Sequence, residues 1–252
     1  MLAGLSRSGL VYRARKKEEA ELIGCIQELA LKHRRYGYRR IWVLLNRKRR
    51  RQGQRPVNRK RVHRLFKLLG LSLPCRRNRK RRGQKVGMPC RAEYPNHVWT
   101  YDFVFDFCEN GRKLKFLTVV DEFTRQSLAI EVNVRLGSRQ VIEALERIAP
   151  EYGRPAYLRS DNGSEFIARR LKIYLAEHGC ETRHIDPGSP WQNAYGESFN
   201  GKFRDEFLNQ EVFHSPAHAR VLAETWRRQY NTQRPHSSLG YLTPAEFAAR
   251  VA

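Results

Sequence analysis

Between residues 98 and 208 the sequence changes repeatedly between the hydrophobic patterns of strands and of helices. Three strand-like segments come first, and helical and strand-like segments then alternate. The predicted strands are 98–107, 114–123, 127–134, 155–160 and 181–186, and the predicted helices are 138–153, 164–179 and 194–208. This order predicts an α/β fold with a mixed five-stranded sheet and helices on both faces, because a sheet must bury its apolar faces against other layers.

Charge divides the chain into two parts. Residues 1–91 contain 29 lysines and arginines but only 4 acidic residues, whereas the remainder contains 20 and 21. A positive charge of this size favours a nucleic acid as partner, through neutralisation of phosphates with release of counterions. A solvated surface and an RNA-binding extension are the alternatives. We predict a basic helical region at 1–74, a basic linker at 75–92, and a core with a C-terminal helical tail at 93–252.

Three helices are predicted in the basic region, at 16–35, 38–52 and 57–71, with Asn58 as the N-cap of the third. Short helices with basic outer faces suit a helix-turn-helix-like DNA-binding module, and an undifferentiated basic helical arm is the other interpretation. The candidate DNA contacts in this region are Arg39, Arg40, Arg59, Lys60, Arg61 and Arg64.

Several classes of protein are excluded by the composition. No segment approaches the roughly 20 apolar residues that cross a bilayer, and the first residues have no apolar core of signal-peptide length. The five cysteines are widely spaced and form no CxxC pair, which indicates neither a disulfide framework nor a zinc site. We expect a soluble cytoplasmic protein that does not bind membranes.

Three acidic residues occupy positions that the predicted sheet can bring together. Asp102 lies within the first strand, Asp161 follows the fourth strand, and Glu197 lies on the helix after the fifth. Ligands of such sheets gather at strand ends, and Asp102 and Asp161 can meet there if the first and fourth strands are neighbours. An ordinary turn aspartate and a solvated helix face are the alternatives.

The helix that carries Glu197 has two different faces. Aromatic residues recur every four positions on one face, at Tyr195, Phe199, Phe203 and Phe207. The opposite face carries a mixture of an acid, an amide, a glycine and an arginine, at Glu197, Asn200, Gly201 and Arg204. This mixture suits a metal ion beside a phosphate.

Three converging carboxylates would repel each other without a cation. Mg²⁺ binds oxygen ligands and needs only a few carboxylates when substrate phosphates are present. Two such ions about 3.5–4 Å apart can activate a nucleophile and stabilise the leaving oxygen of a displacement at phosphorus. The pattern therefore predicts Mg²⁺ or Mn²⁺, as two ions, with DNA as the substrate.

The spacing of these acids resembles the D,D(35)E signature of the transposase and retroviral integrase superfamily, since 35 residues separate Asp161 in "SDNGSEF" from Glu197 in "NAYGESFNGKF". Arg204 stands where this family carries a Lys or Arg that contacts DNA. The tail "YNTQRPHSSLGYLTPAEF" and the segment "YGYRRIWVLLN…VNRKRVHRLFKLLGL" also resemble the OrfB-type transposases of the bacterial family named after insertion sequence three.

The resemblance implies an RNase H-like core and a DNA strand cleavage followed by strand transfer, with Asp102, Asp161 and Glu197 as catalytic metal ligands. It adds Asn200, Lys202 and Arg204 as DNA contacts, binding to element ends and target, a homo-oligomer on DNA and a nucleoid location. It also implies a partner from an upstream reading frame, OrfA, because this chain has no sustained heptads. The end sequences, the target preference and the oligomeric state are left open.

Other functions compete with this one. A nuclease of the same fold would cut DNA without joining it, and a non-catalytic DNA-binding regulator derived from a transposase would do neither. Arg234, His236 and Tyr241 superficially suggest a tyrosine recombinase, but a second arginine and the required spacing are missing. Asp121 in "VVDEFTR" is expected to have a structural role rather than to bind a metal directly.

Overall fold

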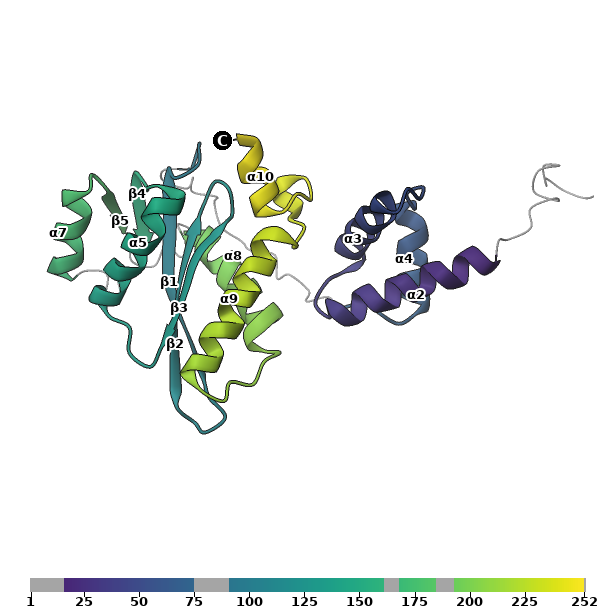
Figure 1. Cartoon of the computed structure of the whole chain (residues 1–252), viewed down its shortest axis with the longest axis horizontal. Helices are drawn as coiled ribbons and strands as arrows, with labels where there is room; N and C mark the ends of the chain where they lie inside the picture. Colours follow the sequence, from purple (N-terminus) through teal and green to yellow (C-terminus); the bar gives the residue numbers. More distant parts are fainter. Residues whose placement is uncertain (1–15, 75–90, 161–167, 185–192, 252) are drawn as a thin grey trace, which may run out of the picture. The chain divides into compact units, whose positions relative to one another are not determined.

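The computed structural model describes residues 16–74, 91–160, 168–184 and 193–251. The chain forms two compact units, Met1–Asn78 and Arg79–Ala252. Figure 1 shows a group of helices in the first unit and a sheet with helices in the second. Among the described residues, no helix is both long and apolar enough to cross a membrane.

The first unit contains the three predicted helices, α2 (Lys16–Lys32), α3 (Tyr38–Arg51) and α4 (Arg59–Leu68). Each helix contributes one apolar stripe to a small core, and the members of this core are Leu22, Ile26, Ala30, Ile41, Leu45, Val62, Leu65 and Phe66. Because the stripes face inward, most of the basic side chains are left on the outer surface.

Polar side chains of α3 hold the connection to α4. Asn46 Nδ2 donates to the carbonyl of Val57 (3.0 Å), and Asn46 Oδ1 accepts from the amide of Val57 (2.7 Å). Trp42 Nε1 donates to the same carbonyl (2.7 Å). The predicted N-cap is confirmed, since Asn58 Oδ1 accepts from the backbone N–H two residues later (2.9 Å). The start of α4 is therefore fixed relative to α3.

The second unit is built on the predicted five-stranded sheet. Its strands are β1 (Val98–Phe107), β2 (Lys113–Asp121), β3 (Ser127–Asn133), β4 (Tyr157–Ser160) and β5 (Glu181–His184), in the order β3-β2-β1-β4-β5. β1, β2 and β3 are antiparallel, whereas β4 pairs in parallel with β1 and β5 with β4. The first and fourth strands are thus neighbours.

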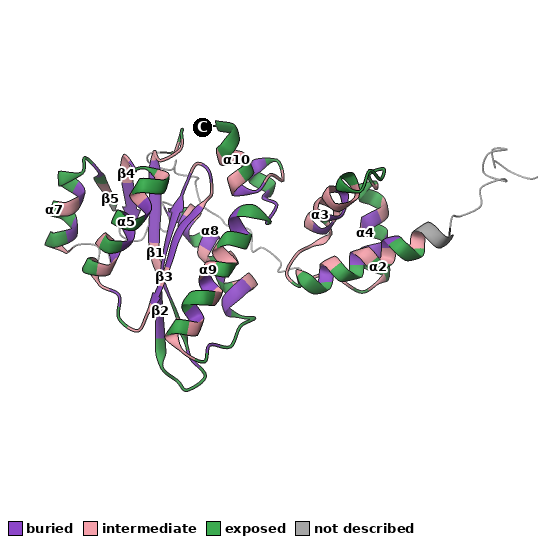
Figure 2. Cartoon of the chain, in the orientation of Figure 1, coloured by how far each residue is buried: buried purple, intermediate pink, exposed green. Residues whose placement is uncertain are grey.

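Two helical layers cover this mixed sheet, as predicted. One face packs against α5 (Ser138–Tyr152) and α7 (Arg169–Glu177). The other face packs against α8 (Ala194–Phe203), a π-helical turn (Arg204–Leu208) and α9 (Pro216–Thr232). The sheet between these layers is largely buried (Figure 2). A last helix, α10 (Pro244–Val251), begins with a capping box, in which Thr243 Oγ1 accepts from the Glu246 amide (3.2 Å).

The predicted helix 194–208 changes form at Arg204. α8 ends at Phe203, and the next turn is π-helical. Arg234 from the tail binds both carboxylate oxygens of Glu206 within this turn (2.5 and 2.6 Å). The periodicity of the helix sequence cannot predict a contact with so distant a residue. Phe207 nevertheless remains buried, so the aromatic face is preserved.

The boundaries of other elements can be compared with the prediction in the same way. β2 ends at Asp121 rather than at residue 123, because the Asp121 carboxylate accepts from the Phe123 amide (2.8 Å) and reverses the chain. α5 begins at residue 138 as predicted, and the amide of Gly137 before it donates to Gln140 Oε1 (2.9 Å). α7 begins at Arg169, whereas residues 164–167 of the predicted helix lie outside the described residues.

Candidate active site

Asp102 lies within β1 on the sheet face that packs against α8, and its side chain is half-buried. Its Oδ1 accepts from the Phe103 amide (2.7 Å), and its Oδ2 accepts from Asn200 Nδ2 of α8 (2.8 Å). Asn200 Oδ1 in turn accepts from Thr118 Oγ1 on β2 (3.0 Å). The carboxylate is therefore oriented by two strands and one helix.

A close approach of α8 to β1 makes this contact possible. Asn193, just before α8, is buried and its Oδ1 accepts from Thr100 Oγ1 of β1 (2.6 Å). A Cβ atom at Gly196 would lie 2.6 Å from Asn193 Oδ1 and 2.9 Å from Thr100 Oγ1. The site needs glycine here for space, since any larger residue would push α8 away from β1.

Glu197 lies in the first turn of α8 and is exposed. Residues three apart on a helix are neighbours, so Glu197 shares a face with Asn200, which binds Asp102. Glu197 has no hydrogen bond or ion pair with another described residue. Two of the three predicted carboxylates, Asp102 and Glu197, thus lie where α8 contacts β1.

Asp161 lies outside the described residues. Ser160, which precedes it in the sequence, is the last residue of β4, and β4 runs parallel to β1 with Arg159 opposite Thr100. Within the described ranges no group of three or more His, Cys, Asp or Glu side chains could hold a metal ion. The donors that are described, the oxygens of Asp102 and Glu197, are of the type that Mg²⁺ and Mn²⁺ prefer, so the residues fit such an ion.

Two further predicted DNA contacts lie on α8 and on the π-helical turn that follows it. Lys202 Nζ donates to the carbonyl and the hydroxyl of Ser198 (2.7 and 2.6 Å). Arg204 Nη2 donates to the carbonyl of Phe105 on β1 (3.1 Å), and the residue is exposed. Both cations lie on or near the helix that carries Glu197, where a phosphate could reach them.

The predicted DNA contacts of the basic unit fall into two groups. Arg39, Arg59 and Lys60 are exposed. Arg40 stacks over the Tyr36 ring (5.2 Å), Arg61 is half-buried, and Arg64 forms a surface ion pair with Glu19 (2.5 Å). The N-terminal end of α4 therefore offers cations to a polyanion.

The tail motif has a packing role that sequence reasoning missed. Besides binding Glu206, Arg234 is only 2% exposed and lies 3.3 Å from His236 Nε2. Asn231 binds the backbone N–H and C=O of Ser127 on β3 (2.9 and 2.8 Å). A buried arginine bound to a carboxylate does not serve as the phosphate-binding arginine of a tyrosine recombinase, so this motif instead joins the tail to the sheet and to the end of α8.

Asp121 has the structural contacts expected of it. Its carboxylate is 2% exposed and accepts from the Asn96 amide (3.2 Å), the Phe123 amide (2.8 Å) and Thr124 Oγ1 (3.0 Å). Burial raises the pKa of Asp121, and these hydrogen bonds oppose the rise. This carboxylate therefore organises the turn after β2.

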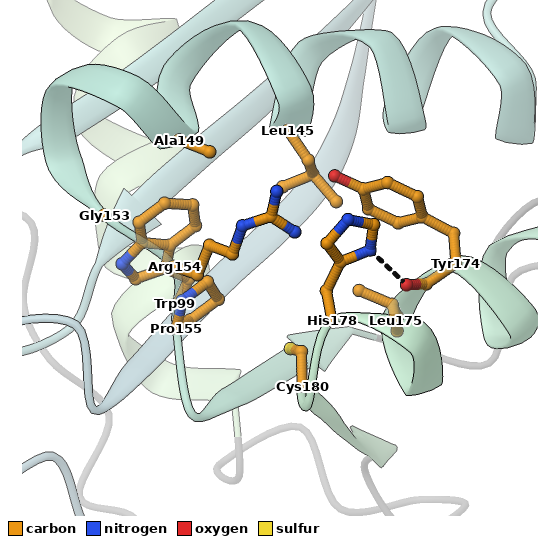
Figure 3. A pocket seen from close by; sticks show the side chains of 10 residues that line it. All are labelled: Trp99, Leu145, Ala149, Gly153, Arg154, Pro155, Tyr174, Leu175, His178 and Cys180. Carbon is orange, nitrogen blue, oxygen red and sulfur yellow. Dashed lines mark hydrogen bonds between the residues drawn. The ribbon is translucent and has the colours of Figure 1, made fainter.

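A cavity lies on the other face of the sheet, between α5 and α7, and Figure 3 shows Arg154 extending toward Tyr174 and His178. Its volume is about 20 Å³, which is room for about one water molecule. Burial raises the pKa of the lining Cys180 thiol to about 11, so this cysteine is not a reactive nucleophile. The cavity is too small to hold a substrate.

Comparisons with known proteins cover both units. A model of an HTH-like domain matches residues 16–80, and two models of the integrase core domain match residues 92–190 and 178–244. An uncharacterized 31.7 kDa protein of insertion element IS407 from Burkholderia multivorans is 45% identical, over 99% of this chain and 88% of that protein. An uncharacterized 39.2 kDa protein of insertion element IS476 from Xanthomonas euvesicatoria is 43% identical, over 98% and 70%.

More distant relatives agree in fold. Transposase InsD for insertion element IS2 of Escherichia coli is 26% identical, over 93% of this chain and 80% of that protein. A chain of the simian T-cell lymphotropic virus intasome, solved in complex with PP2A regulatory subunit B56 gamma, has a TM-score of 0.55 and 18% identity, over 73% of this chain and 66% of that chain. The second unit therefore has the RNase H-like integrase-core fold, preceded by an HTH-like domain.

Proposed function

We propose that this chain, which belongs to the insertion-element transposases with an integrase core of the family named after insertion sequence three, cleaves and joins DNA strands through Asp102, Asp161 and Glu197. The observation that carries the proposal is the bond from Asn200 to Asp102 (2.8 Å), because it ties β1 to the helix face that presents Glu197. Asp161 directly follows β4, the parallel neighbour of β1.

Each residue has a separate task in this proposal. Asp102 is held in one orientation by Asn200 and the Phe103 amide, which keeps its remaining lone pairs directed away from these donors. Glu197 is exposed and available to a ligand. Asn200 contacts Asp102, Lys202 and Arg204 lie further along the same helical segment, and all three would bind phosphates of the DNA.

Asp102, Asp161 and Glu197 would together hold two Mg²⁺ or Mn²⁺ ions. When bound, such ions activate the attacking oxygen and stabilise the leaving oxygen of an in-line displacement. No covalent intermediate with the protein is needed, which agrees with the buried or paired state of the tail residues that would otherwise suggest a recombinase.

The basic region, taken as residues 1–74 with the linker 75–92, would bind the element ends through α3 and α4, while residues 93–252 carry out the reaction. Binding should weaken steeply with salt, because many phosphates are neutralised. A plot of the logarithm of the DNA association constant against the logarithm of the salt concentration has a negative slope. We expect Arg59→Ala to make this slope less steep by about 0.9. Arg64→Ala should have a smaller effect, since Glu19 already pairs with Arg64. Equal slopes in wild type and Arg59→Ala would contradict this assignment.

The reaction requires two DNA ends and a target, so we propose a homo-oligomer on DNA at the bacterial nucleoid in the cytoplasm. A protein from an upstream reading frame, OrfA, or a fusion with it, would supply multimerisation. Sedimentation of the chain with and without end DNA tests the first point, and a chain that stays monomeric on paired ends contradicts it.

A cleavage and joining assay tests the proposed function. Wild type and Glu197→Gln are incubated with Mg²⁺ or Mn²⁺ and DNA that carries the inverted repeats beside the element. Metal-dependent joining that the variant loses supports the transposase, whereas cutting without joining indicates a nuclease of the same fold. Salt-sensitive binding with neither reaction, also after addition of the upstream protein, indicates a non-catalytic regulator.

A further inference from the structure

The turn between β2 and β3 carries two charged side chains that reach toward the elements of the candidate active site. This turn, Asp121–Gln126, is closed by backbone bonds from Asp121 to Gln126 (3.0 Å) and from Arg125 to Asp121 (2.9 Å). The Glu122 amide also donates to the carbonyl of Val98 at the start of β1 (3.0 Å). The turn is therefore a rigid support for the side chains of Glu122 and Arg125.

Glu122 is paired with β4. Its side chain is fully buried, and its Oε1 lies 3.2 Å from Nε of Arg159, which is 2% exposed. Arg159 stands two positions before Asp161 in the sequence. The Glu122 oxygens have no hydrogen-bond donor in the described structure, so the buried carboxylate is balanced by the charge of nearby arginines.

Arg125 connects the same turn to α8. Its guanidinium carbon lies 3.7 Å from the centre of the Tyr195 ring, two positions before Glu197. Arg125 has a φ of 65°, a left-handed conformation that disfavours residues other than glycine. The bond from the Arg125 amide to the carbonyl of Asp121 holds the backbone in this conformation. Burial raises the pKa of Glu122, and the positive charges of Arg159 and Arg125 oppose this rise.

We propose that the Asp121–Gln126 turn positions the catalytic carboxylates, with Glu122 holding the end of β4 through Arg159 and Arg125 holding the start of α8 through Tyr195. This inference rests on the proposed function, because Asp161 and Glu197, which follow Arg159 and Tyr195 in the sequence, are the metal ligands proposed above. Glu122, Arg125, Arg159 and Tyr195 are positioning residues, since they act through the elements that carry the acids.

Replacement of Glu122 by Gln tests the first half of this proposal. The neutral amide removes the negative charge that faces Arg159 and Arg125, so the ion pair between the turn and β4 is lost. We expect Mn²⁺ binding to the full-length chain, followed by electron paramagnetic resonance of the free ion, to weaken about tenfold, as for supports of metal ligands. The Mg²⁺ concentration for half-maximal cleavage should rise equally, with DNA affinity unchanged.

Tyr195 tests the second half without disturbing a buried charge. Tyr195→Leu removes the ring under Arg125 and should weaken Mn²⁺ binding. Tyr195→Phe keeps the ring and should bind Mn²⁺ with the affinity of wild type. These variants also decide the matter if Glu122→Gln does not fold. Equal Mn²⁺ affinity of Tyr195→Leu and wild type would overturn the proposal.

A matched control separates positioning from stability. Glu224 on α9 pairs with Arg227 (2.7 Å) and Arg228 (2.8 Å), outside the candidate site, so Glu224→Gln should lower stability without changing Mn²⁺ affinity. If Glu122→Gln behaves like this control, the turn is only structural and the proposal fails. If wild type itself neither binds Mn²⁺ nor cleaves DNA, the catalytic function fails as well, which distinguishes the two failures.

Discussion

Gly196 allows the sharpest test of the α8–β1 contact. A methyl group at this position would lie 2.6 and 2.9 Å from two oxygen atoms, which is 0.5–0.8 Å short of the 3.4 Å where ordinary contact begins. Asn193 cannot turn aside cheaply, because it is buried and its bond to Thr100 would be lost. The first turn of α8 must therefore move away from β1 in Gly196→Ala.

The expected changes in stability and activity differ in size. Alanine improves helix propensity by about 1 kcal/mol, whereas forced contacts in a packed core cost about 1–3 kcal/mol, so the net loss of unfolding free energy should be about 0–2 kcal/mol. A movement of half an ångström would stretch the bond from Asn200 to Asp102 beyond about 3.3 Å, where hydrogen bonds become weak. Because misplacement by about 1 Å costs about 10²-fold in rate, we expect cleavage to fall tenfold or more.

Urea denaturation and the metal-dependent cleavage assay measure these two quantities. Gly201→Ala is the matched control for stability, since a Cβ there meets no atom within 4 Å and α8 should gain about 0.5–1 kcal/mol. If Gly196→Ala gains stability as Gly201→Ala does and cleaves DNA like wild type, the reasoning about close approach is refuted.

Two further variants test other contacts. Asn200→Ala should weaken Mn²⁺ binding about tenfold or more by releasing Asp102, and unchanged affinity in a titration would contradict this. Arg234→Met removes the guanidinium that binds the largely buried carboxylate of Glu206, so urea denaturation should show a loss of about 3–5 kcal/mol that the added change Glu206→Leu largely restores.

Local patterns predicted the order of strands and helices because hydrophobic periodicity is set by neighbours along the chain. The aromatic residues Phe199, Phe203 and Phe207 lie in the core as their four-residue spacing requires. Asn58 and Thr243 cap helices because capping depends on side chains within three residues. Whether β1 and β4 are neighbours stayed open at the level of sequence, because the pairing of strands depends on the whole fold; the structure shows that they pair in parallel.

Contacts between distant residues could not be predicted in the same way. The bond between Asn200 and Asp102 spans 98 positions, and the pair of Arg234 and Glu206 spans 28. Neither contact leaves a periodic signal in the sequence. Asn200 is therefore predicted only as a ligand-binding or DNA-contacting residue, its bond to Asp102 is not predicted, and the π-helical turn is missed. Glu122 and Arg125 lie in a polar turn, and a polar turn sequence does not indicate which distant elements its side chains contact. Their contacts with β4 and α8 could therefore not be inferred either.

The contacts of α8 predict how variants combine. Gly196 and Asn200 act on one and the same quantity, the distance between α8 and Asp102, since the close approach at Gly196 allows the bond of Asn200. If Gly196→Ala already breaks that bond, Asn200→Ala should add little in its background, and the effects on Mn²⁺ affinity should be strongly non-additive. Arg234 acts on the far end of the helix through Glu206, so its effect should add to that of Gly196→Ala. Additivity of Gly196→Ala with Asn200→Ala would mean that the two residues support the carboxylates independently.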